Sequence, residues 1–314
     1  MIHTRGKDML FIEAHGHCWN ELHGRRFDTK KLLPLDYGKV SIGGEEMQFV
    51  LPENRDSRVP FEVLEAYQNL LGFDKVVILQ TPCYGEQYEY INDVIAKHPG
   101  KYVTVGLANP QDKKAFIEEA ALCLDTYKYK GLKFESPDTP FDMVAPENQF
   151  EEIMKRDAFF MLDMGWFDEP NNFLIDDLTE VARRYPTMKI IIPHLGISKI
   201  FDPVHAEKLD CLKRVYDLVS VNENVYYDCS GIPMLAERAG QKYPWPVISN
   251  ALKLGKEMGV IDRIMWGSDA PCLLLTCTYQ QQVDCIVDHC DFLTDDEMEN
   301  LLGKTANRVW FDCE

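Results

Sequence analysis

The chain has 314 residues, 46% hydrophobic and 27% charged, which is the composition of a globular protein long enough to bury a large core. Its length is compatible with about two ordinary domains or with one longer barrel domain. The 51 acidic residues against 33 Lys and Arg give a formal net charge of −18, which argues against binding to nucleic acid or to an anionic membrane surface.

Eight short apolar runs are rich in β-branched or aromatic residues, as strands buried on both faces of a parallel sheet are. They cover residues 9–17, 75–82, 102–110, 131–136, 159–166, 189–196, 224–231 and 263–271. Stretches with helical periodicity lie between and after them, at residues 61–71, 86–98, 113–127, 148–157, 173–185, 204–221, 246–258 and 279–290. One more helix is expected after Thr294, where the acidic residues that follow suit the positive end of a helix.

This alternation of strands and helices predicts an α/β protein with a parallel sheet and crossover helices. Eight such units fit a closed (β/α)8 TIM barrel, so we expect a single barrel domain over residues 1–314. A doubly wound open sheet is the alternative, but no G-x-G-x-x-G motif follows the first strand to mark a dinucleotide site.

Residues 19–60 form an unusually long connection, because the first two strands begin at positions 9 and 75 and the later strands follow at much shorter intervals. Within this insertion, VSIGGEEMQFV predicts a small hairpin around Gly43 and Gly44. Loops that follow barrel strands lie on the carboxyl-terminal face, where barrel enzymes carry out their chemistry. We therefore expect the insertion to lie over the barrel mouth; a surface decoration is the alternative.

His15 and His17 are two residues apart at the end of the first strand, so both side chains are expected to face the barrel mouth. Two converging imidazoles suit a divalent metal ion, and a hydrogen-bonded core pair is the alternative. Glu13 is expected on the same face, either as a ligand or, preferably, as the partner that orients one of the rings.

Asp269 and His194 end two other strands. The eighth strand of a closed barrel neighbours the first, so Asp269 is expected beside the His pair, as a metal ligand or as the group that takes a proton from water. A helix-capping turn is its alternative. His194 ends the sixth strand between Pro193 and Gly196, and it is a candidate general acid or base, with a structural core His as the alternative.

These segments resemble the amidohydrolase superfamily, and in it the amidohydrolase-related branch that includes aminocarboxymuconate-semialdehyde decarboxylase, other decarboxylases, hydratases and lactone hydrolases. The resemblance covers the chain from A-H-G-H (14–17) through P-H-L-G (193–196) and W-G-S-D-A-P (266–271) to the closing LLGKTANRVWF (301–311). It implies that His15, His17 and Asp269 hold a metal ion and that His194 is the catalytic acid or base.

One position departs from the pattern of that branch, which usually ends the fifth strand with a metal-binding His. Here the corresponding residue is Asp163, which either ligates in its place or leaves the site weakened. Two ligating carboxylates would shift the preference from zinc toward manganese or magnesium. We expect one divalent ion, with zinc as the first choice.

Four further residues are candidates for substrate binding. Lys133, on the fourth strand, would present a cation in the barrel interior or snorkel out between strands. Trp166 would line the pocket or serve only in packing. Arg55 and Arg58 would place cations over the mouth for an anionic substrate, unless they form salt bridges in a surface loop.

The main hypothesis is a metal-dependent hydrolase of a small lactone, amide or carboxylated compound, with His194 or Asp269 moving the proton. A decarboxylase or hydratase (a lyase) on the same site is the first alternative, and a non-catalytic barrel with a degraded metal site is the second. Related barrels often form homodimers, but no interface can be read from the sequence.

The first ten residues, MIHTRGKDML, contain no continuous apolar segment of the kind found in secretory signals. No apolar run reaches the roughly 18 residues that a membrane-spanning helix needs. The ten cysteines form no C-x-x-C pair, and several lie in predicted strands or helices. We therefore expect reduced thiols and a cytoplasmic protein.

Overall fold

The computed structural model describes residues 1–22, 32–135, 149–164, 174–196 and 209–312. Its centre is a barrel of parallel strands, which are in chain order β3 (Ile12–Gly16), β7 (Lys75–Ile78), β8 (Tyr102–Thr104) with its continuation β9 (Gly106–Leu107), β10 (Gly131–Glu135), β11 (Phe159–Asp163), β12 (Lys189–Ile192), β13 (Val225–Asp228) and β14 (Ile264–Met265). Hydrogen bonding follows the order β3-β7-β8 in one sheet and β9-β10-β11-β12-β13-β14 in the other.

The barrel closes where the residues after β14 meet β3. The amide of Ala14 donates to the carbonyl of Trp266 at 3.2 Å, and the amide of Asp269 donates to the carbonyl of His15 at 2.8 Å. Gly267 lets the two segments come this close, because a Cβ at this position would lie 2.7 Å from Cβ of His15. The predicted α/β class and the TIM barrel are confirmed.

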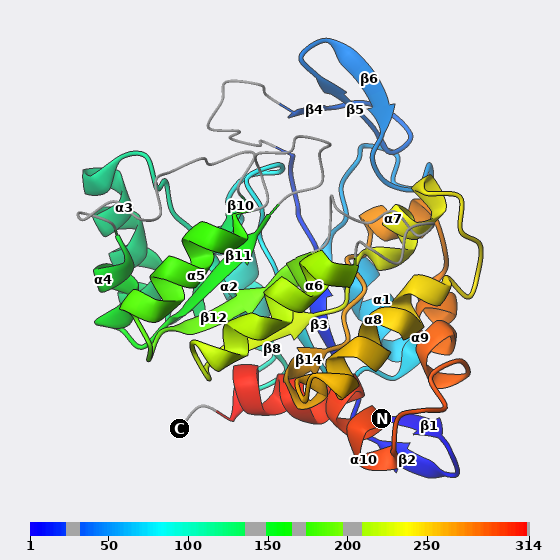
Figure 1. Cartoon of the computed structure of the whole chain (residues 1–314). Helices are drawn as coiled ribbons and strands as arrows, with labels where there is room; N and C mark the ends of the chain where they lie inside the picture. The colour runs from blue at the N-terminus through cyan, green and yellow to red at the C-terminus, as the bar shows by residue number, and fades with distance from the viewer. Residues whose placement is uncertain (23–31, 136–148, 165–173, 197–208, 313–314) are drawn as a thin grey trace.

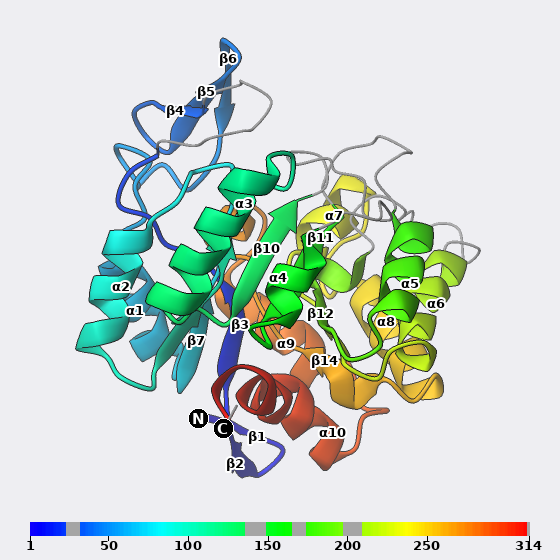
Figure 2. The same ribbon diagram turned by 90° about the vertical axis from the view of Figure 1, so that its left-hand side faces the viewer.

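Helices surround the barrel, as Figures 1 and 2 show. They are α1 (Phe61–Leu71), α2 (Tyr88–Lys97), α3 (Lys113–Ala120), α4 (Phe150–Met154), α5 (Ile175–Arg184), α6 (Leu209–Tyr216), α7 (Ile232–Arg238), α8 (Pro246–Glu257), α9 (Tyr279–Val287) and α10 (Asp295–Glu299). As expected, α10 begins after Thr294, whose hydroxyl accepts from the amide of Glu297 while the Glu297 carboxylate accepts from the amide of Thr294. None of the described helices is both long and apolar enough to cross a lipid bilayer.

Two layers of apolar side chains fill the barrel and the space between its strands and the surrounding helices. The larger one lies between the strands and the helices. The smaller one fills the barrel interior and is closed by Trp310 near the end of the chain; its other buried members are Ile12, Ala14, Val77, Leu79, Val105, Phe159, Met161, Ile191, Met265, Ala306 and Val309. The interior is therefore a packed core, and only the polar residues at the strand ends are left to form a site.

The insertion carries its own small antiparallel sheet, β4 (Leu32–Pro34), β5 (Lys39–Ile42) and β6 (Glu45–Gln48). The predicted hairpin is confirmed: Ile42 pairs with Glu45, and Gly43 and Gly44 have φ of 61° and 92°, the left-handed backbone that a tight two-residue turn requires. Figure 2 shows this sheet at the end of the barrel toward which β10 points.

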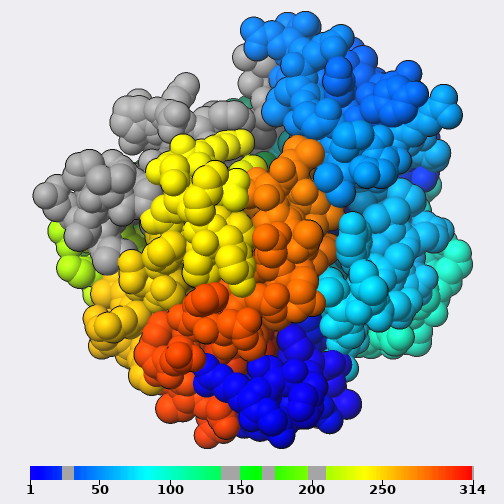
Figure 3. Space-filling model, turned by 90° about the vertical axis from the view of Figure 1, so that its right-hand side faces the viewer, coloured from blue at the N-terminus to red at the C-terminus, as the bar shows by residue number. Residues whose placement is uncertain are grey.

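The amino-terminal segment differs from the prediction of a strand over 9–17. Residues up to Met9 form a separate hairpin, β1 (Ile2–Thr4) and β2 (Lys7–Met9), and the barrel strand begins only at Ile12. In Figure 3 this hairpin and the insertion lie at opposite ends of the face that is shown. The apolar run was continuous in sequence, so periodicity could not reveal the break.

Candidate metal and acid–base site

His15 lies at the end of β3 and is completely buried. Its Nδ1 lies 2.9 Å from Oδ2 of Asp228, so this nitrogen carries the ring proton and donates it to the carboxylate. Its Nε2 is buried, has no hydrogen-bond partner among the described residues, and lies 3.6 Å from Oδ1 of Asp269. Burial lowers the pKa of His15 to about 4, so the ring is neutral and Nε2 presents a lone pair.

His17 is oriented in the same way by different partners. Its Nδ1 lies 2.9 Å from the carbonyl oxygen of Leu79 and 2.5 Å from the hydroxyl of Tyr84. A carbonyl oxygen can only accept, so the proton of His17 is on Nδ1. Its Nε2 lies 3.1 Å from Oδ1 of Asp269.

Asp269 has a left-handed backbone, with φ of 65°, just after the strand that closes the barrel. The 3-10 helix that follows, Cys272–Leu275, has no side-chain cap, so the carboxylate of Asp269 faces the two rings instead of capping a turn. Burial alone would raise the pKa of this carboxyl group, but the hydrogen bond with His17 and the charge of His194 outweigh burial and lower it. Asp269 is therefore ionised.

These three residues could hold a divalent metal ion. One ligand atom from each of His15, His17 and Asp269 lies within 4.8 Å of the others. The donor set of two imidazoles and one carboxylate suits zinc and several other divalent ions. The unpartnered Nε2 of His15 fits this assignment, because a buried nitrogen without a partner is costly unless something binds it.

A second group, His15, His194 and Asp228, has ligand atoms at similar spacing. The hydroxyl of Ser230 already lies among them, 3.0 Å from Nδ1 of His15 and 2.9 Å from Nδ1 of His194, and it donates to Asp228. A side chain thus fills the space that an ion would need. The group with Asp269 is the better candidate for a metal site.

His194 lies in the turn Pro193–Gly196 after β12, with φ of 55°. Its backbone amide donates to Oδ1 of Asp228 at 3.1 Å, and its Nδ1 lies 3.1 Å from the carbonyl oxygen of Ser230. Its Nε2 lies 3.5 Å from Oδ2 of Asp163. Burial alone would lower the pKa of His194, but the carboxylates of Asp163, Asp269 and Asp228 together outweigh burial and raise it to about 9, so the ring is protonated at neutral pH.

Asp163, at the end of β11, is brought to His194 and does not join either candidate metal group. Lys133 on β10 is almost fully buried, and its Nζ lies 2.8 Å from Oε1 of Glu135. Burial alone would lower the pKa of Lys133, but Glu135 and Asp163 raise it, so the ammonium group remains charged. A cation therefore lies in the barrel interior among the carboxylates of the site.

The two predicted arginines of the insertion are exposed, and Glu13 contacts the cluster through backbone amides. Arg58 is 52% exposed and pairs with Asp56 at 2.6 Å, and Arg55 is exposed on the same loop. Trp166 lies outside the described residues. Glu13 does not orient a ring: its Oε1 accepts from the backbone amides of His15 at 2.8 Å and Ser268 at 2.9 Å, and so joins the first strand to the last.

Sequence reasoning missed Asp228, Ser230 and Tyr84. Asp228 could have been predicted from its position, because it ends the seventh strand in the same way that Asp269 follows the eighth. Ser230 and Tyr84 had none, since a single Ser or Tyr in a loop gives no indication of what it contacts.

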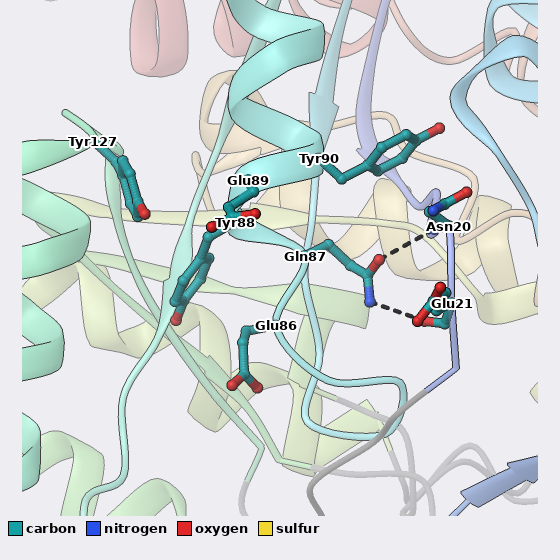
Figure 4. A pocket seen from close by; sticks show the side chains of 8 residues that line it. All are labelled: Asn20, Glu21, Glu86, Gln87, Tyr88, Glu89, Tyr90 and Tyr127. Atoms are coloured by element: carbon teal, nitrogen blue, oxygen red, sulfur yellow. Dashed lines mark hydrogen bonds between the residues drawn. The ribbon is translucent and has the colours of Figure 1, made fainter.

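A separate cavity of about 430 Å³ lies beside the amino end of α2 (Figure 4). Its lining residues are Asn20, Glu21, Glu86, Gln87, Tyr88, Glu89, Tyr90 and Tyr127. The side chain of Gln87 accepts from the amide of Asn20 at 3.1 Å and donates to the carbonyl of Glu21 at 2.9 Å, which joins the start of the insertion to α2. None of the His and Asp residues described above lines this cavity, so it is not the candidate site.

Comparison with known proteins gives a consistent picture. Residues 12–311 match a family model described as amidohydrolase. A probable 2-pyrone-4,6-dicarboxylic acid hydrolase from Acinetobacter baumannii, with citric acid bound, superposes with a TM-score of 0.70 at 16% identity, over 96% of this chain and 99% of that chain. An amidohydrolase from Burkholderia multivorans with bound zinc superposes with a TM-score of 0.68 at 16% identity, over 96% of this chain and 99% of that chain. The 5-carboxyvanillate decarboxylase of Sphingomonas paucimobilis superposes with a TM-score of 0.64 at 15% identity, over the same shares of the two chains.

Proposed function

The chain belongs to the amidohydrolase family, and on that premise we propose that it is a metal-dependent hydrolase of a small lactone, amide or carboxylated compound. The observation that carries the proposal is the convergence of Nε2 of His15, Nε2 of His17 and a carboxylate oxygen of Asp269 in one buried group. Acceptors at Nδ1 of both imidazoles leave each Nε2 for a metal ion, and the carboxyl group of Asp269 is ionised. This supports an intact site over a degraded, non-catalytic one.

We propose that the ion is zinc. Two imidazoles and one carboxylate, with a further position open to substrate or water, are a common catalytic zinc set, and the Burkholderia amidohydrolase holds zinc. Manganese or magnesium would be favoured only if Asp163 also ligated, and its contact with His194 argues against that. The chemistry that a divalent ion supplies in such a site is Lewis-acid activation of a carbonyl group and of water.

The protein residues provide the proton transfers. Asp269, ionised and beside both imidazoles, accepts a proton at its carboxylate from the attacking water. His194, protonated and held by Asp163 at Nε2, donates its proton to the leaving oxygen or nitrogen. Lys133 and the arginines of the insertion, Arg55 and Arg58, orient the substrate, and the insertion borders the entrance to the site. A substrate carboxylate would have to compete with Glu135 for Lys133.

Nonoxidative decarboxylation is the second candidate, and one observation favours it. Because its pKa is raised to about 9, His194 carries at neutral pH the proton that a carbanion-like carbon needs when carbon dioxide leaves. One structural neighbour is a decarboxylase, although at 15% identity that likeness shows the fold alone.

The two reactions are separated by assaying zinc-loaded protein against lactones and amides, with release of acid as the readout, and against carboxylated phenols, with release of carbon dioxide. Hydrolysis that His194→Asn abolishes supports the proposal. Release of carbon dioxide without hydrolysis would replace it with the lyase. Activity that is equal in wild type and His194→Asn would remove His194 from both mechanisms.

A further inference from the structure

The hydroxyl group of Tyr84 contacts a predicted metal ligand from outside the candidate site. Tyr84 lies in the loop between β7 and α2 and is 1% exposed. Its hydroxyl lies 2.7 Å from the carbonyl oxygen of Leu79 and 2.5 Å from Nδ1 of His17. A phenol has one proton to donate, and the carbonyl can only accept, so the hydroxyl donates to Leu79 and accepts from Nδ1–H of His17.

This contact has a consequence at the other side of the ring. The Nδ1 proton of His17 has two acceptors, this hydroxyl and the carbonyl oxygen of Leu79 at 2.9 Å, so the nitrogen left for a metal ion is Nε2, which lies 3.1 Å from Oδ1 of Asp269. The hydrogen bond also limits rotation of the ring. Partners of this kind are worth 10–100-fold in metal affinity where they have been removed.

The ring of Tyr84 belongs to the core of the insertion. It stacks on Trp19, with ring centroids 4.5 Å apart and planes at 25°. Both residues are members of one buried cluster, whose other members are Leu22, Leu32, Val40, Val50 and Val59. The position of Tyr84 therefore depends on how the insertion packs.

Trp19 is itself fixed by the far end of the insertion. Its backbone amide donates to the carbonyl of Val59 at 2.8 Å, the amide of Val59 donates back at 3.2 Å, and the indole N–H donates to the carbonyl of Ser57 at 2.8 Å. The hydroxyl of Ser57 in turn donates to the carbonyls of Leu35 and Lys39. A continuous set of contacts thus runs from strand β5 through Ser57, Trp19 and Tyr84 to His17.

We propose that Tyr84 and Trp19 are positioning residues through which the folded insertion, residues 32–59 together with Trp19, sets the metal affinity of His17. The inference rests on the proposed metal site. Coupling between two sites is reciprocal, so a metal ion bound at His17 must stabilise the insertion by the same factor by which the folded insertion strengthens metal binding. Loss of packing in the insertion would then release the metal.

Four proteins measured together test this coupling: wild type, Tyr84→Phe, Trp19→Leu and the double variant. Tyr84→Phe keeps the stacked ring and removes only the hydroxyl, whereas Trp19→Leu keeps the hydroxyl and removes the stack. Tyr216→Phe is the matched control, because it deletes an equally buried hydroxyl on α6, outside the barrel, that donates to the carbonyl of Ala251 at 3.2 Å. The readouts are the zinc Kd, from competition with a chromogenic chelator, and amide hydrogen exchange in β5 and β6 with and without zinc.

The carbonyl of Leu79 still accepts from Nδ1 of His17 in Tyr84→Phe, so we expect this variant to weaken zinc binding by about 10-fold, and Trp19→Leu by a smaller factor. The double variant should bind zinc as Tyr84→Phe does, because the stack acts only through the hydroxyl. Zinc should slow exchange in β5 and β6 of wild type and of Tyr216→Phe, and this effect should be absent in Tyr84→Phe. Exchange in the zinc-free proteins shows whether each variant keeps the insertion folded.

Two results would overturn the inference and leave the proposed function standing: a zinc Kd of Tyr84→Phe within twofold of wild type, or effects of the single variants that multiply in the double variant. Failure of the proposed metal site would look different. In that case wild type and His15→Ala would bind zinc alike, and the coupling would fall together with the site.

Discussion

Replacing Asp228 by Asn tests how the position of one proton controls the metal site. One oxygen of Asp228 accepts from Nδ1 of His15 at 2.9 Å, and the other accepts from the backbone amides of His194 and Ser230 at 3.1 Å each and from the Ser230 hydroxyl. An amide offers one accepting oxygen and one donating NH2 group. Three donors surround Oδ1 of Asp228, and only one, Nδ1 of His15, contacts Oδ2. The amide oxygen of the introduced Asn therefore takes the place of Oδ1, and its NH2 group takes the place of Oδ2 and faces His15.

Nδ1 of His15 must then accept a hydrogen bond, so the ring proton moves to Nε2, the atom that faces Asp269. A protonated Nε2 cannot ligate a metal. We expect zinc affinity to fall by at least 10–100-fold, or about 1.4–2.7 kcal/mol. The number of hydrogen bonds is unchanged, so the free energy of unfolding should fall by no more than about 1 kcal/mol. Asp228→Ala instead leaves buried N–H groups unpaired and should cost roughly 2–6 kcal/mol of stability.

The assay is a zinc competition titration, with nitrogen NMR of the imidazoles to identify the tautomer of His15 and thermal unfolding to measure stability. Cys229→Ala is the matched control, since Cys229 is the next residue, equally buried, and packs in the core outside the barrel. A folded Asp228→Asn protein that binds zinc within twofold of wild type, or that keeps the His15 proton on Nδ1, would refute this reasoning.

Three further predictions concern other residues. His194→Gln should fold and bind zinc normally, yet lose about 10²–10⁴-fold in kcat, as measured by steady-state kinetics; an active variant would contradict its role as acid. Lys133→Met should lower the free energy of unfolding in urea by about 3 kcal/mol, because Glu135 loses its buried partner, whereas an unchanged midpoint would show that the pair contributes nothing. Partial burial raises the pKa of Glu297, but its contacts with Lys256 and Thr294 outweigh burial and lower it. The ionised Glu297 carboxylate therefore stabilises the fold above the unfolded pKa near 4.5, and this stabilisation is lost as the pH falls through the lower folded value. In thermal unfolding, Glu297→Gln should lower the free energy of unfolding by about 1 kcal/mol at pH 7 and by little at pH 3. An equal loss of stability at both pH values would contradict the assignment.

The barrel could be predicted from the sequence because its strands are buried on both faces and read as continuous apolar runs. The same continuity hid where strands start and stop. The run that contains Met9 is divided between a hairpin and β3, and the run over 102–110 is interrupted at Val105 between β8 and β9. The helix expected over 113–127 ends as an α-helix at Ala120 and continues as a π-helical turn over Ala121–Thr126.

The site could be predicted only where strand ends carry chemistry. His15, His17, Asp269 and His194 each end or follow a strand, and barrel closure brings them together. Their orienting partners depend on distances across the barrel that no spacing reveals. Asp163 illustrates the limit: its place at the end of β11 was predicted, but its contact with His194 depends on the left-handed turn after β12.

The central claim is that His15, His17 and Asp269 hold one divalent ion. Elemental analysis of protein purified without chelator, for wild type, His15→Ala and Cys229→Ala, tests it most directly. We predict roughly one zinc per chain in wild type and in Cys229→Ala, and less than about a tenth of that in His15→Ala. Equal metal content in wild type and His15→Ala would contradict the account.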